Sequence, residues 1–114
     1  MKKIDRNIIE NVFCAAQNEI VGKIRTQKIF YLLEQMGMSS GIRFSYHHYG
    51  PYSEQLARQL DIISFDGKLR ESSKDNGFGG TYSVYEFDGA DAEIEKVGEL
   101  DSEVAKHAVE LMKA

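Results

Sequence analysis

Two stretches decide the fold that this sequence predicts: KIRTQKIFY at residues 23–31 and YGPYS at residues 49–53. The first begins an amphipathic pattern that predicts a helix over residues 23–36. The second contains the single proline of the chain and predicts a tight turn at Gly50-Pro51. Ser53 can accept a hydrogen bond from a free amide of a following helix, so a further helix is expected directly after the turn.

The flanking segments carry local signals of their own. Apolar residues at helical spacing from Ile9 to Ile20, preceded by Asp5 as a cap, predict an N-terminal helix. Residues 42–49 are rich in β-forming residues and favour a short strand. Residues 68–73 and 81–87 predict a hairpin, because Asn76-Gly77 between them suits a tight turn.

The last part of the chain predicts helix again. One apolar stripe is expected to face the core, and its members are Val97, Leu100, Val104, Ala108 and Leu111. Gly98 and the cap signals at residues 101–103 are expected to divide this helix into two pieces.

This order of elements predicts an α+β, mainly helical fold: a winged-helix-like three-helix core with a β-hairpin wing and a C-terminal helix. We expect a single domain over residues 1–114. It would comprise a helical core at 1–66, the hairpin wing at 67–88 and an acidic C-terminal helical segment at 89–114. A chain of 114 residues can bury enough surface to fold without a metal or a disulfide.

The charge of the chain is unevenly distributed. Residues 81–114 contain nine acidic and three basic residues, a net charge of −6, within a chain of net charge −4. We predict that Glu93, Glu95 and Glu99 in this block steer a basic partner, the alternative being a solvated helix face. With one cysteine, no signal peptide and no apolar run of membrane-spanning length, we expect a cytoplasmic protein without a membrane partner.

Residues with catalytic or metal-binding chemistry are sparse, so we expect a non-enzymatic protein without cofactor or metal. His47 and His48 are neighbours on a predicted strand and would point to opposite faces, which does not suit a shared metal ion. Cys14 lies in an apolar stretch, where a buried, unreactive thiol is expected. The glycine-rich residues 76–80 precede a strand and so lack the helix dipole of a phosphate site.

Two further groups of residues are candidates for binding. Tyr46, Tyr49 and Tyr52 surround the predicted turn and could form an aromatic surface for a partner, or could pack the turn onto the helix at 23–36. If the fold bound DNA, one basic residue of the recognition helix and three of the wing would contact it: Arg58, Lys68, Arg70 and Lys74.

The two opening stretches together resemble the Panacea antitoxin domain, which is also found in SocA-like proteolytic adaptors and related phage proteins. That family combines a Lys-Leu-Gln-Lys-Leu-Leu-Tyr-like helix with a later Tyr-Gly-Pro turn. Gln27-Lys28, Tyr31 and residues 49–52 occupy the matching positions, and the likeness covers roughly residues 20–70. The segment between the motifs is short here, and the acidic tail is not part of the family pattern.

The resemblance implies a non-enzymatic protein that neutralises a toxin by contact or delivers it to a protease. We therefore expect a small protein-binding domain of antitoxin or phage-regulator type, whose partner is a toxin, a protease or a defence component. One alternative is a winged-helix DNA-binding transcriptional regulator. Another is a phage-encoded inhibitor of a host defence system that uses its acidic surface. The sequence leaves the oligomeric state open, a homodimer included.

Overall fold

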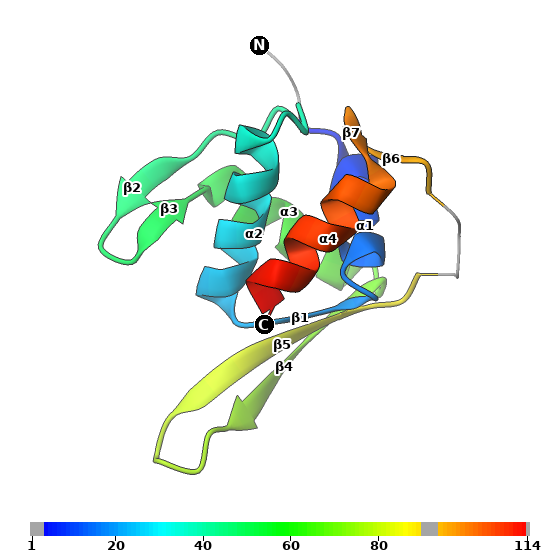
Figure 1. Cartoon of the computed structure of the whole chain (residues 1–114). Helices are drawn as coiled ribbons and strands as arrows, with labels where there is room; N and C mark the ends of the chain where they lie inside the picture. The colour runs from blue at the N-terminus through cyan, green and yellow to red at the C-terminus, as the bar shows by residue number, and fades with distance from the viewer. Residues whose placement is uncertain (1–3, 90–93, 114) are drawn as a thin grey trace.

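The computed structural model describes residues 4–89 and 94–113. Within these residues the chain forms four helices and seven short strands (Figure 1). In chain order they are α1 (Arg6–Ala15), β1 (Glu19–Val21), α2 (Lys23–Gln35), β2 (Ser45–His47), β3 (Gly50–Tyr52), α3 (Glu54–Phe65), β4 (Leu69–Asp75), β5 (Thr81–Phe87), β6 (Lys96–Val97), β7 (Leu100–Asp101) and α4 (Ser102–Lys113).

Several elements form where local signals predict them. The Asp5 side chain caps α1 by accepting a hydrogen bond from the Asn7 amide at 2.9 Å. The β4–β5 hairpin is confirmed, and its tip is held by Asn76, whose Oδ1 accepts from the Gly80 amide at 3.1 Å. These caps and turns depend on residues close in sequence, which explains why they could be predicted.

The described strands form three antiparallel sheets. The largest has the order β1-β5-β4, and two-stranded hairpins are formed by β2 with β3 and by β6 with β7. In β1, Ile20 pairs with Tyr85 of β5, a partner far away in sequence. The prediction that the first helix continues to Ile20 is therefore wrong. Gln17 and Asn18 adopt positive φ angles of 59° and 66° and end the helical path after α1.

The hydrophobic core lies where α1, α2 and the three-stranded sheet meet. Phe13 is only 1% exposed, and its ring centroid lies 6.1 Å from that of Phe30, 6.3 Å from Tyr85 and 5.9 Å from Phe87. Tilted and edge-on aromatic pairs at these distances add to the free energy of simple burial. Phe13 therefore connects both helices to the sheet.

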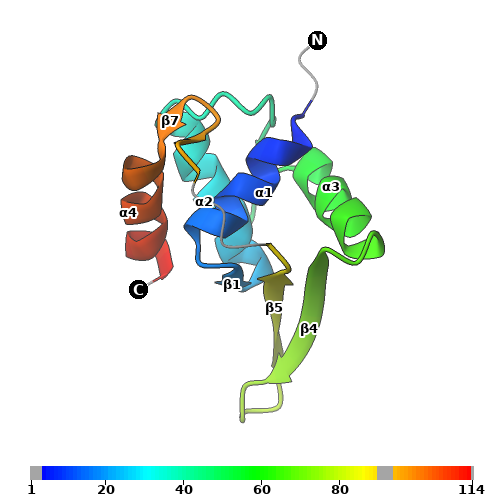
Figure 2. The same cartoon turned by 90° about the vertical axis from the view of Figure 1, so that its right-hand side faces the viewer.

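The predicted winged-helix-like three-helix core is wrong. The structure is an α+β fold in which α4 packs against both α1 and α2, so that α1 and α2 lie between α3 and α4 (Figure 2). Val97, Ala105 and Val109 from the C-terminal region are fully buried. The core is therefore completed by this region, and the hairpin belongs to a sheet with β1 instead of forming a separate wing.

Two local predictions also need correction. The turn lies at His48-Tyr49, and Gly50-Pro51 begins strand β3, which pairs with β2. The stripe predicted for the C-terminal helix is shifted, because α4 begins only at Ser102 and buries Ala105, Ala108 and Val109. Val104 and Leu111, predicted to be buried, are 46% and 65% exposed.

No helix in the described part of the chain is both long and apolar enough to cross a bilayer.

The docking of the C-terminal segment can be tested at Gly98. Gly98 has a positive φ of 62°, and an added Cβ would overlap the Met38 carbonyl oxygen, whereas Gly37 has a φ of 109° and open space around it. We expect Gly98→Ala to lower the free energy of unfolding by about 1–3 kcal/mol more than Gly37→Ala, because both positions have a positive φ but only Gly98→Ala adds a clash. Urea unfolding measures both. Equal losses would contradict the close packing of Gly98 on Met38.

Candidate partner-binding site

The two stretches that decide the fold meet through the side chain of Gln27. Its Nε2 donates to the Ser53 carbonyl oxygen at 3.1 Å, and its Oε1 accepts from the Ser53 amide at 2.8 Å. Gln27 and Ser53 are 5% and 1% exposed. Ser53 in turn caps α3, because its hydroxyl oxygen accepts from the Leu56 amide at 3.1 Å. The Gln27 side-chain amide of α2 therefore positions the residue that caps α3.

The neighbouring motif residues of α2 support the β2–β3 hairpin. The Lys28 side chain passes Gly50, where an added Cβ would lie 3.4 Å from Lys28 Cε. The Tyr31 ring packs edge-on against Phe44, with centroids 5.4 Å apart, and against Tyr46 at 6.4 Å. The hairpin, drawn beside α2 in Figure 1, is thus held by one face of that helix.

This hairpin carries the predicted tyrosines, and we call residues 45–52 the tyrosine hairpin. Tyr46 and Tyr49 are 78% and 48% exposed, and Tyr52 is half-buried. Tyr49 and Tyr52 form an edge-on pair at 6.4 Å, and His47 lies 5.0 Å from Tyr52. Tyr46 instead contacts Tyr31 of α2. The structure therefore brings Tyr49 and Tyr52 together and places Tyr46 in a second aromatic contact.

The Tyr31–Tyr46 contact is also polar. A hydrogen bond to Tyr46 raises the pKa of Tyr31, and the electrostatic interaction with Tyr46 and burial raise it further. All three effects favour the neutral phenol. The Tyr31 hydroxyl therefore remains neutral near neutral pH.

The predicted acidic site is not part of this surface. Glu93 lies outside the described residues. Glu95 and Glu99 are exposed beside β6, on the opposite side of α2 from the tyrosine hairpin (Figure 1). Their backbones have structural roles: the Glu99 amide donates to the Met38 carbonyl oxygen at 3.0 Å, and the Glu95 carbonyl accepts from the Ser102 amide at 3.0 Å.

The four basic residues of the predicted DNA site are exposed, and two of them, Lys68 and Arg70, form ion pairs with carboxylates. Lys68 Nζ is 3.7 Å from a Glu10 oxygen, and Arg70 Nη2 is 3.1 Å from Glu86. Lys74 extends from the far end of β4, and Arg58 lies on α3. Carboxylates next to basic groups repel phosphate, so this surface is poorly suited to DNA.

The candidate metal and nucleophile residues do not assemble. The three histidines and Cys14 fall in the described residues, and no group of three metal-binding side chains occurs there. Cys14 is partly buried in α1. Burial raises the pKa of the Cys14 thiol, and the nearby Glu10 carboxylate raises it further. Both effects disfavour the thiolate that a nucleophile requires.

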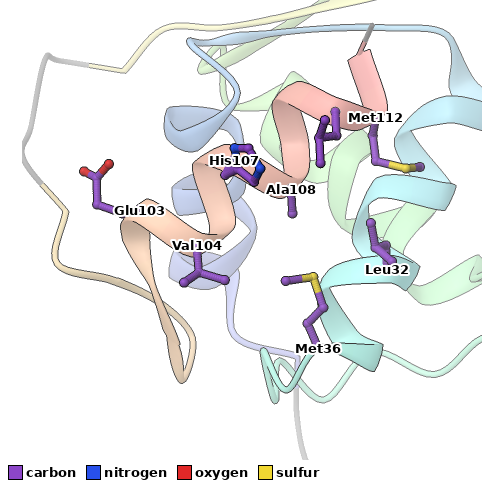
Figure 3. Close-up of a pocket in the computed structure, with 8 residues that line it drawn as sticks. Leu32, Met36, Glu103, Val104, His107, Ala108 and Met112 are labelled. Atoms are coloured by element: carbon purple, nitrogen blue, oxygen red, sulfur yellow. The ribbon is translucent and has the colours of Figure 1, made fainter.

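Sequence reasoning missed an apolar groove between α2 and α4. The groove has a volume of about 560 Å³. Leu32 and Met36 of α2 face Val104 and Ala108 of α4 across it (Figure 3). The helical spacing of Ala105, Ala108 and Val109 could have indicated this groove. In a helix that begins at Ser102, these three residues form the buried face of α4.

Comparisons with known proteins give little functional information. No protein-family model matches the chain, and no solved structure matches it. The chain is 34% identical over 59 residues to "Uncharacterized protein YwgA" of Bacillus subtilis (strain 168). This similarity covers 52% of the chain but 36% of that protein, so the chain spans well under half of its relative's length. The resemblance to the Panacea antitoxin domain therefore remains a prediction.

The state of Cys14 can be tested by alkylation. Because its pKa is raised by burial and by Glu10, we expect iodoacetamide to modify the folded protein at least about tenfold more slowly than a free cysteine near neutral pH. The alkylation rate of Cys14 should still increase with pH at values where the alkylation rate of free cysteine no longer changes. Urea-unfolded protein is the control and should react like free cysteine. A folded protein that reacts as fast as the free thiol would contradict the assignment.

Proposed function

We propose that this chain is a small non-enzymatic protein-binding domain of antitoxin or phage-regulator type, which neutralises or regulates a partner protein by direct contact. The observation that carries the proposal is the tyrosine hairpin, where Tyr46 and Tyr49 are 78% and 48% exposed on a two-stranded element. Tyrosine is enriched at the centres of protein interfaces, because its ring provides apolar area and its hydroxyl a hydrogen bond.

The support of the hairpin strengthens this proposal. An isolated two-stranded hairpin is only marginally stable in water. Here Gln27 holds the residue that follows β3, and Tyr31 packs against Phe44 and Tyr46. A surface that is ordered before binding loses less conformational entropy when a partner arrives. Contacts with α2 thus hold the hairpin that carries the exposed tyrosines in one conformation.

The apolar α2–α4 groove is the other surface on which a partner could dock. Val104 and Leu111 are exposed along it. It lies away from the motif residues that resemble the antitoxin family, so we place the main contact at the tyrosine hairpin. An experiment must therefore compare the two surfaces directly.

Site-specific photo-crosslinking in the native host makes this comparison. The photoreactive p-benzoyl-phenylalanine would replace Tyr46 on the hairpin, Val104 in the groove, or Phe65, which is 92% exposed at the end of α3. We expect one dominant protein adduct from position 46 and none of that mass from position 65, identified by mass spectrometry. Tyr49→Ser should reduce this adduct by at least about fivefold, because an interface tyrosine contributes on the order of 1–2 kcal/mol.

The same experiment can refute the proposal. A specific adduct from position 104 alone would move the contact to the groove. Adducts with nucleic acid, or no specific protein adduct from any of the three positions, would contradict a protein-binding function.

A further inference from the structure

A second cavity lies next to the tyrosine hairpin, at the junction of α2, α3 and the β4–β5 hairpin. It has a volume of about 510 Å³. Its charged and tyrosine side chains come from five helices and strands and from the turn before β3. They are Lys23, Tyr49, Tyr52, Asp61, Glu71 and Tyr85. We call it the tyrosine cleft. Tyr49 and Tyr52 belong both to this cleft and to the tyrosine hairpin.

The cleft contains the hydroxyl of a buried tyrosine, Tyr85. Tyr85 is 6% exposed, and its hydroxyl has no hydrogen-bond partner among the described residues. No described side-chain polar atom is both sealed from solvent and unpaired, so this hydroxyl is accessible to solvent, and Tyr85 lines the cleft. Burial raises the pKa of Tyr85, and the negative charges of Glu71 and Asp61 raise it further. The hydroxyl therefore stays neutral and can still donate and accept a hydrogen bond.

The charge of the cleft is negative. The cleft is lined by two carboxylates, Asp61 and Glu71, and by one ammonium group, Lys23, which leaves a net charge of −1. Lys23 Nζ lies 3.3 Å from Glu71, and the Ser83 hydroxyl donates to Glu71 at 3.3 Å. Asp61 has no ion-pair or hydrogen-bond partner in the parts of the chain that the structure describes. The cleft thus contains an uncompensated carboxylate, and an anionic ligand would be repelled.

The aromatic residues of the cleft also favour a cation. Tyr49 and Tyr52 form an edge-on pair with centroids 6.4 Å apart. The face of a tyrosine ring attracts a positive charge, and arginine stacks on such a face more readily than lysine because its guanidinium group is planar and weakly hydrated.

We propose that the tyrosine cleft binds the guanidinium group of an arginine side chain presented by the partner protein. The Asp61 carboxylate accepts from the guanidinium N–H groups, the Tyr85 oxygen accepts a further hydrogen bond, and the rings of Tyr49 and Tyr52 contact the planar group. Five N–H donors match these acceptors better than a lysine ammonium does. This assignment rests on the proposed function, since the arginine would be an anchor residue beside the tyrosine hairpin.

The test uses N-acetyl-arginine N-methylamide as a probe of the whole chain, with the neutral citrulline and the lysine counterparts as controls. NMR of the tyrosine ring signals follows binding. We expect a dissociation constant on the order of millimolar for the arginine compound, with shifts at Tyr52 and Tyr85. The citrulline compound should bind at least about tenfold more weakly, because it lacks the charge.

Variants locate the binding within the cleft. Asp61→Asn should weaken binding of the arginine compound about five- to tenfold, and Tyr85→Phe about threefold. Glu99→Gln removes the same charge from the exposed turn beside β6 and should change the affinity by less than about twofold. Neither cleft variant loses a hydrogen bond within the described residues, so melting temperatures should stay close to that of the wild type.

Three results would overturn the assignment: no binding of the arginine compound, equal binding of the citrulline or lysine compound, or an equal loss with Glu99→Gln. Failure of the cleft can be distinguished from failure of the proposed function. If binding of the arginine compound follows the cleft variants and none of the three crosslinking positions gives a specific protein adduct, the cleft binds a guanidinium group but the protein-binding proposal is contradicted. A specific adduct at position 46 without binding of the arginine compound removes the cleft assignment alone.

Discussion

The pair of hydrogen bonds between the Gln27 side-chain amide and the Ser53 backbone is the constraint on which the rest of the structure depends. Both groups are buried, so water cannot replace either bond at low cost. Ser53 is at the same time the last residue before α3 and the cap of that helix. One side chain of α2 thus fixes where the β2–β3 hairpin ends and where α3 begins. The side-chain amide supplies the donor and the acceptor that this position requires from two separate atoms, Nε2 and Oε1.

The surfaces proposed for binding follow from this constraint. The tyrosine hairpin lies against α2, and the tyrosine cleft lies where α2, α3 and the β4–β5 hairpin meet. A shift of α3 relative to α2 would move Asp61 away from Tyr52 and Tyr85. The short motifs at residues 23–31 and 49–53 are therefore explained first as the two sides of an internal contact. The exposed tyrosines use the rigidity that this contact provides.

The sequence predicted those parts of the fold that depend on neighbouring residues. The Asp5 and Ser53 caps and the β4–β5 hairpin are examples, because cap and turn chemistry is local. Strand β1 could not be predicted in the same way. Ile20 is apolar at a helical spacing from Phe13 and Ala16, and only its pairing with Tyr85 makes it part of a strand. The burial of α4 also depends on where that helix begins, which the apolar spacing alone does not determine.

In the candidate site, too, contacts between residues close in sequence could be predicted and contacts between distant residues could not. Tyr49 and Tyr52 are close in sequence, and their proximity was predicted. The cleft was not, because Asp61, Glu71 and Tyr85 come from three different elements that only the tertiary structure brings together.

The central claim is that the Gln27 amide is needed both as a donor and as an acceptor, and comparing the pH dependence of Gln27→Glu and Gln27→Ala tests it most directly. Near neutral pH both variants should lose about 2–4 kcal/mol of unfolding free energy, because buried Ser53 groups lose a partner. An introduced carboxyl that is buried has a raised pKa in the folded state, so its protonated form, which again donates, is favoured by folding. The loss for Gln27→Glu relative to the wild type should therefore shrink by at least about 1 kcal/mol as the pH falls to about 4.5, while that for Gln27→Ala stays constant. Parallel pH dependence of the two variants, or a loss below about 0.5 kcal/mol for both, would contradict the account.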